Sequence, residues 1–118
     1  MVNVDRLVAR YETLIGYYRE IGELTHGITE KLEAGGKLTG VAPLLNQKKG
    51  VVDSIEEASR DIAEYKKSLK EEHTITESDA VLIRDVEIRL TSVVNRFIDE
   101  NSKMYDLMMK QGVKVRGR

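Results

Sequence analysis

The sequence predicts an all-α protein, an antiparallel three-helix bundle packed like a coiled coil, with helices over residues 4–33, 40–70 and 77–110. Three observations predict it. Apolar residues recur at steps of three and four in three long stripes, which keeps them on one face of a helix because a turn takes 3.6 residues. Short connections separate the stripes, so successive helices should be antiparallel neighbours. No segment shows the alternating pattern of a strand.

The first predicted helix has an apolar stripe interrupted only by Thr25, whose hydroxyl we expect to bond to a backbone carbonyl. Its members are Val4, Leu7, Tyr11, Leu14, Tyr18, Ile21, Thr25, Ile28 and Leu32. Gly16, Gly22 and Gly27 lie inside the helix, where each costs about 1 kcal/mol relative to alanine. Two explanations stay open. The glycines permit close packing against a neighbouring helix or a gentle bend, or they mark a labile segment that yields to a partner. Residues 35 and 36, both glycine, supply the left-handed conformation that ends a helix.

The second predicted helix begins after Thr39, a candidate N-cap, with Pro43 in or just before its first turn, where the missing N–H costs little. Its stripe consists of Val41, Leu44, Lys48, Val51, Ile55, Ala58, Ile62, Tyr65 and Leu69. Lys48 interrupts this stripe. We expect its stem to pack while its ammonium reaches water, and an interhelical pair with an acid is the alternative.

The third predicted helix starts at a capping box formed by Thr76 and Asp79, and Gly112 is its expected stop. Its stripe consists of Ile83, Val86, Leu90, Val93, Phe97, Glu100, Met104 and Leu107. We therefore expect one helical domain over residues 1–112. Residues 113–118 follow as a basic, flexible tail.

The third helix carries more apolar surface than a three-helix bundle requires. The additional residues flank its stripe and gather toward its C-terminal end; they are Val94, Ile98, Tyr105, Met108 and Met109. Methionine-rich helical surfaces adapt to varied partner helices, so these five residues are the candidate partner-binding site. A wide but ordinary core face is the alternative.

Composition narrows the classes of function. The net charge of −1 offers no basic field for nucleic acid, and the chain has no cysteine. His26 and His73 are the only histidines, and no catalytic, cofactor or metal motif accompanies them. We expect no enzyme, no cofactor and no metal. No apolar run reaches the roughly 20 residues of a membrane span, and the N-terminal residues lack the order of a signal peptide, so we expect a cytoplasmic protein.

Residues 32–55 resemble the first helix junction of the bacterial flagellar type III export chaperones, the FlgN/FliT-like group. That junction has a glycine-containing turn, then leucines, a basic residue and an aliphatic pair. The matching positions here are Leu44, Leu45, Lys48, Val51 and Val52, after the glycines at 35 and 36. The resemblance implies a short, cytoplasmic, all-helical chaperone that holds the C-terminal segment of a hook-associated or filament-cap protein.

Two functions therefore follow from the sequence. The first is a non-enzymatic chaperone or adaptor whose partner is a protein client or a partner helix. The second is a structural coiled-coil module that self-associates into a homo-oligomer.

Overall fold

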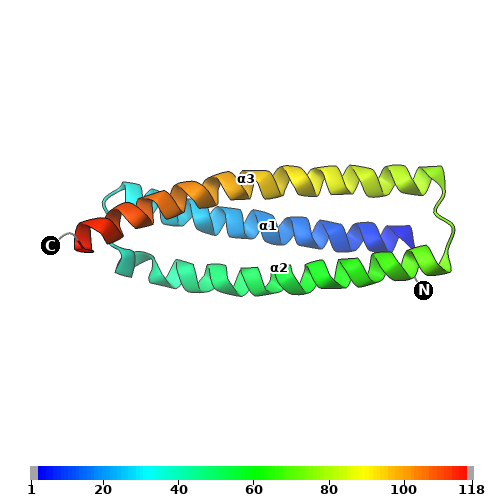
Figure 1. The fold of residues 1–118 in the computed structure, drawn as a ribbon, viewed down its shortest axis with the longest axis horizontal. Coiled ribbons are helices and arrows are strands. Elements are labelled where there is room, and N and C mark those ends of the chain that lie inside the picture. The colour runs from blue at the N-terminus through cyan, green and yellow to red at the C-terminus, as the bar shows by residue number, and fades with distance from the viewer. Residues whose placement is uncertain (1–2, 117–118) are drawn as a thin grey trace.

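Three helices joined by two short connections make up the part of the chain that the structure describes (Figure 1). The computed structural model describes the backbone of residues 3–116 and the side chains of residues 3–111. The helices are α1 (Val4–Glu33), α2 (Leu38–Glu72) and α3 (Glu77–Arg116), with no strand among residues 3–116. They run antiparallel in sequence order and form a rod of 63 × 20 × 19 Å. The predicted all-α, three-helix bundle is confirmed.

Both ends of α1 are closed by specific local contacts. Asn3 caps the start, because its side chain accepts a hydrogen bond of 2.8 Å from the Arg6 backbone N–H. At the end, Gly35 has a φ of 89°, the left-handed conformation that the sequence predicted there. The Gly36 N–H then donates to the Lys31 carbonyl over 2.8 Å, which satisfies an otherwise free carbonyl of the last turn.

The start of α2 differs from the sequence prediction. The helix begins at Leu38, with Lys37 as its N-cap in an extended conformation, and so Thr39 is not the cap. The Gly40 N–H bonds to the Lys37 carbonyl over 2.9 Å, which closes the first turn before a cap at Thr39 could form. Pro43 consequently lies inside the helix rather than in or before its first turn.

The capping box at the start of α3 is confirmed, but the predicted end is wrong. The Asp79 N–H donates to the Thr76 hydroxyl over 3.1 Å, and the Thr76 N–H donates to the Asp79 carboxylate over 3.3 Å. The helix continues past Gly112 to Arg116. A glycine costs a helix about 1 kcal/mol without forbidding it, so Gly112 does not end α3. The predicted flexible tail, residues 113–118, is therefore helical in its backbone up to Arg116, and residues 117–118 lie outside the described part.

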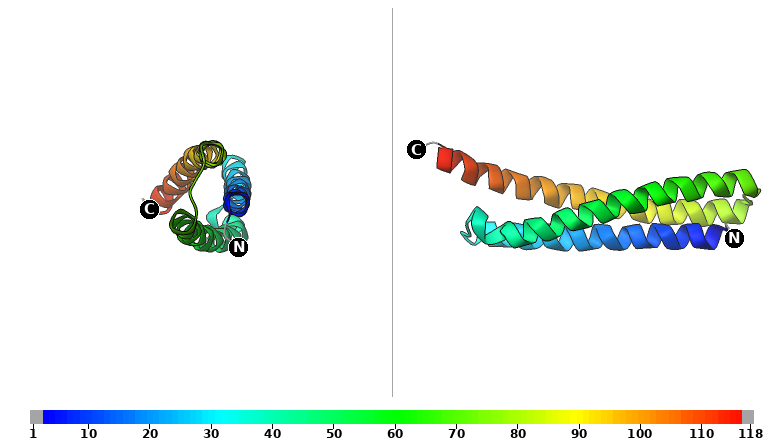
Figure 2. Two further views of the ribbon diagram at one scale, coloured as in Figure 1. Left: turned by 90° about the vertical axis from the view of Figure 1, so that its right-hand side faces the viewer. Right: turned by 90° about the horizontal axis from the view of Figure 1, so that it is seen from below.

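The helix α1 is the centre of the bundle. Its backbone approaches α2 and α3 along its length, whereas α2 and α3 hardly approach each other. Seen end-on, the three helices lie at the corners of a triangle (Figure 2). The larger core cluster includes Leu7, Ile21, Val51, Ile62 and Val86. A smaller cluster near the 33–38 turn consists of Ile28, Leu32, Val41 and Met104.

The interior glycines of α1 are not required by close packing. A Cβ atom built at Gly16 or Gly22 meets no atom within 4 Å. At Gly27 the nearest atom is Leu44 Cδ1 at 3.9 Å, an ordinary contact. The packing explanation is therefore wrong for Gly16 and Gly22, and the labile-segment explanation stays a prediction.

Candidate functional site

Three of the five candidate partner-binding residues form an exposed apolar stripe on α3. Ile98 is 51% exposed, Tyr105 54% and Met109 66%. Their spacing of seven and four residues places them on one flank of the helix. We call these three residues the exposed stripe.

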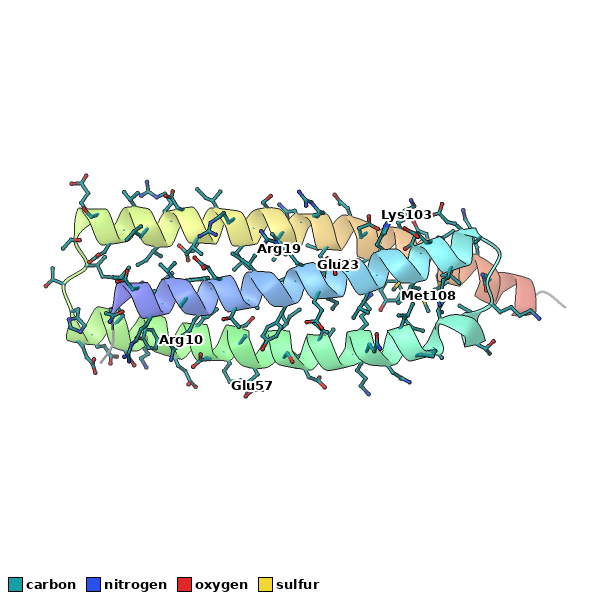
Figure 3. All side chains as sticks on the ribbon, turned by 180° about the vertical axis from the view of Figure 1, so that it is seen from behind. Arg10, Arg19, Glu23, Glu57, Lys103 and Met108 are labelled. Atoms are coloured by element: carbon teal, nitrogen blue, oxygen red, sulfur yellow. The ribbon has the colours of Figure 1, made fainter. Side chains whose placement is uncertain are left out.

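Val94 and Met108, the other two candidates, are only partly exposed. Met108 packs against the smaller core cluster, and Figure 3 shows it in the interior near the 33–38 turn. Its thioether therefore belongs to the core more than to a free surface. The structure brings Ile98, Tyr105 and Met109 together at the surface and leaves Val94 and Met108 at its edge.

The exposed stripe lies on the flank of α3 that faces α2. The Tyr105 ring centroid is 5.6 Å from the Lys48 ammonium of α2, which fixes the direction of this flank. The C-terminal end of α3 leans away from α1 and α2 and extends past the 33–38 turn (Figures 1 and 2). The side chains of Tyr105 and Met109 are therefore accessible, because the backbone of α2 beside this flank hardly approaches α3.

A buried lysine lies beneath the exposed stripe. Lys48 is only 8% exposed, and its ammonium donates a hydrogen bond to the Asn101 side-chain oxygen. The ammonium also lies 3.5 Å from the Met104 sulfur and 5.6 Å from the centroid of the Phe97 ring. The expectation that this ammonium reaches water is wrong, because α3 covers it.

Lys48 forms no ion pair with any of the described carboxylates. The alternative expectation of a pair with an acid is therefore also wrong. Burial lowers the pKa of Lys48 below its ordinary value, because desolvation penalises the charged form. The sequence predicted that Lys48 interrupts the apolar stripe, but it did not indicate that the Asn101 amide would accept a hydrogen bond from Lys48.

Glu100 is the one charged residue in the apolar stripe of α3, and it faces α1 instead of Lys48. One of its oxygens lies 3.5 Å from Nδ1 of His26, whose Nε2 lies 2.5 Å from Glu30. The second Glu100 oxygen is buried without a hydrogen-bond partner. A hollow of about 400 Å³ opens beside this group between α1 and α3.

The side chains around the hollow between α1 and α3 do not favour one chemical class of ligand. The Tyr18 and Phe97 rings border it, with centroids 6.0 Å apart. Its rim carries both signs of charge, from Arg19 and Arg96 and from Glu23. Figure 3 shows Arg19 and Glu23 along the side of α1 that adjoins α3.

The outer face of α3 exposes two further apolar side chains, Val81 at 49% and Ile88 at 60%. They are seven residues apart and so share one face. Ile88 borders Arg84 and Glu87 of its own helix, whereas Lys48 lies beside Asn101 and Tyr105. These residues provide a matched reference for tests of the exposed stripe.

The described residues do not gather into a chemical centre. No three His, Asp or Glu side chains within the described part lie close enough to hold a metal ion. None of the described helices combines the length and apolar character of a membrane span. Comparisons of this chain with protein-family models, with curated proteins and with solved structures gave no match.

Proposed function

We propose that this chain is a non-enzymatic helical chaperone or adaptor that shelters an amphipathic segment of another protein. The partner we infer is an export client of the flagellar hook-associated or filament-cap type, held in the cytoplasm before secretion. The observation that carries the proposal is the exposed stripe of Ile98, Tyr105 and Met109 on one flank of α3.

The dimensions of the exposed stripe favour a helical occupant. From Ile98 to Met109 the stripe extends roughly 16 Å, at 1.5 Å per residue. Fully burying a large apolar side chain contributes about 1.5–3 kcal/mol, and these half-exposed residues each gain part of that. Association also costs rotational and translational freedom, so a partner must contact all three residues together. An amphipathic helix of three or more turns meets this requirement.

The resemblance of residues 32–55 to flagellar export chaperones supports the class of client. A client awaiting export must stay unfolded, and its amphipathic segment needs an apolar surface to cover it. The interior glycines that packing does not require are consistent with a bundle that adjusts to such a segment.

Calorimetric titration with a peptide from the C-terminal helix of a hook-associated protein of the same organism tests the proposal. We expect Ile98→Glu to weaken binding at least tenfold (about 1.4 kcal/mol), because the bound helix would lose an apolar contact and would desolvate a carboxylate against its apolar face. Ile88→Glu is the matched control, since Ile88 is 60% exposed on the outer face of the same helix. It should bind like the unaltered protein.

Far-UV circular dichroism of both variants should equal that of the unaltered protein. Equal loss of binding in the two variants would show that the exposed stripe is not the binding surface. If the unaltered protein binds no peptide of this client class, the proposed function is wrong.

Self-association into a homo-oligomer is the second candidate function. The exposed pair of Val81 and Ile88 on the outer face favours it, because a second copy could cover these residues. Light scattering at tens of micromolar separates the two functions. A monomer mass counts against the oligomer, whereas a dimer that Ile88→Glu dissociates and Ile98→Glu does not would support it.

A further inference from the structure

We infer that the segment bound on the exposed stripe carries an acidic side chain that pairs with Lys48. The inference rests on the proposed function, because it concerns the chemistry of the partner on that same surface. The occupant is an amphipathic helix with a carboxylate between apolar residues.

The Lys48 ammonium has no carboxylate partner among the described side chains. A charge buried to 8% exposure is costly unless it is paired. Other basic residues of the bundle have carboxylate partners, such as Arg10 with Asp61 at 3.0 Å and Lys66 with Glu87 at 3.0 Å. Lys48 has only neutral neighbours, the Asn101 amide and the Met104 sulfur. The region beneath the stripe is therefore complementary to a negative charge.

The second step is the route from the surface to Lys48. Ile98 and Tyr105 are two turns apart, roughly 10 Å along the axis of α3. Asn101 lies between them and is partly exposed. A side chain that enters between Ile98 and Tyr105 therefore meets Asn101 first, and Lys48 is bonded to Asn101. The four-carbon stem of lysine lets the ammonium move outward to meet it.

The third step is the chemistry of the group that fits. The Asn101 oxygen accepts the hydrogen bond from Lys48, which leaves the NH₂ group of the same amide as a second donor. An ammonium and an amide NH₂ both donate, so they match a carboxylate and not an amine. Lys48 is only 8% exposed, and such a pair is stronger where little water surrounds it.

Three designed amphipathic helical peptides test the inference, identical except for one central residue that is Glu, Gln or Lys. Fluorescence anisotropy should give the Glu peptide about tenfold tighter binding than the Gln peptide, and the Lys peptide the weakest binding. Lys48→Met should remove the preference for Glu over Gln. Lys49→Met changes the charge equally at the exposed neighbouring position and should keep the preference.

Each other outcome overturns a defined part of the inference. If the Glu and Gln peptides bind equally and Ile98→Glu still weakens both, the acidic contact is wrong and the proposed function stands. If Lys49→Met loses the preference as fully as Lys48→Met, general surface charge explains it and the role of Lys48 is wrong. If none of the three peptides binds the unaltered protein, the acidic contact is wrong, and the titration with the client peptide still decides the proposed function. If sedimentation shows a dimer that Ile98→Glu dissociates, a second copy occupies the stripe and both proposals fail. The comparison of the Glu and Gln peptides uses the unaltered protein. The acidic contact can therefore be contradicted even if Lys48→Met does not fold.

Discussion

At the scale of single residues, Glu87 of α3 joins all three helices through one carboxylate oxygen. The Tyr11 hydroxyl of α1 donates to this oxygen over 2.9 Å, and the Lys66 ammonium of α2 donates to it over 3.0 Å. Burial alone would raise the pKa of Glu87, but hydrogen bonds from Lys66 and Tyr11 and the charges of Lys66 and Lys70 outweigh it. The pKa of Glu87 therefore lies below its ordinary value. Burial and the bond to Glu87 together raise the pKa of Tyr11.

Glu87→Gln should lower the free energy of unfolding by about 1 kcal/mol at pH 7, a modest loss because the Glu87 side chain is 41% exposed. The folded pKa lies below the unfolded one, so the stabilisation is complete above the unfolded pKa of about 4.3. It is lost as the pH falls through the folded pKa. Urea unfolding at a series of pH values from neutral to acid should therefore show the two proteins converging in acid.

The exposed Glu64 of α2 supplies the control for this measurement. Glu64→Gln should change the free energy of unfolding little at any of these pH values. A Glu87→Gln difference that stays constant into acid would contradict the role of the ionised carboxylate.

At the scale of helices, the glycines of the first hairpin should respond to alanine in opposite directions. Gly22→Ala should raise the free energy of unfolding by about 1 kcal/mol, because its Cβ meets no atom within 4 Å and alanine favours the helix. Gly36→Ala should lower it, because a Cβ there would lie 2.6 Å from the Lys31 carbonyl oxygen. Thermal unfolding followed by circular dichroism measures both, and a destabilising Gly22→Ala would restore the close-packing explanation.

The helices and their buried faces could be predicted from the sequence because the period of apolar residues directly sets the buried face of a helix. Their ends were less predictable. Lys37 starts α2 without a side-chain cap, so no cap residue marks the start, and Gly112 only weakens a helix that other contacts maintain. Gln111, for example, donates to the Gly36 carbonyl over 2.8 Å and ties α3 to the 33–38 turn.

The candidate site could be predicted only in part. Ile98, Tyr105 and Met109 are exposed, as surplus apolar residues should be, whereas Met108 packs on the core. In a straight helix, positions seven residues apart differ in direction by about 20°. A side chain that flanks the apolar stripe at one end of a long helix can therefore point into the core at the other end. The burial of Lys48 depends on Asn101, which is 53 residues away in the chain and carries no local signal.

At the scale of the whole molecule, the bundle is organised around α1. The backbones of α2 and α3 pack on α1 and hardly approach each other. Side-chain contacts such as those of Lys48 with Asn101 and Lys66 with Glu87 connect the two outer helices. A change in the core of α1 therefore disturbs two interfaces, and a change in the core of α2 or α3 mainly disturbs one. Under the proposed function, the partner helix would lie along the flank of α3 beside α2.

Three isoleucine substitutions, one in each helix, test this organisation, because every helix buries at least one isoleucine in the larger core cluster. Ile21 of α1 is 1% exposed, Ile62 of α2 is 6% and Ile83 of α3 is 7%. Ile21→Ala should lower the free energy of unfolding by about 4 kcal/mol, against about 2.5 kcal/mol for Ile62→Ala and Ile83→Ala, since large-to-small core changes cost more where less of the surroundings can collapse. Urea unfolding with an unchanged dependence on denaturant concentration gives the three values directly. Equal losses, or a larger loss at Ile62 or Ile83, would mean that the outer helices stabilise each other as much as α1 stabilises them, and the flank between them would then have little freedom to receive a partner.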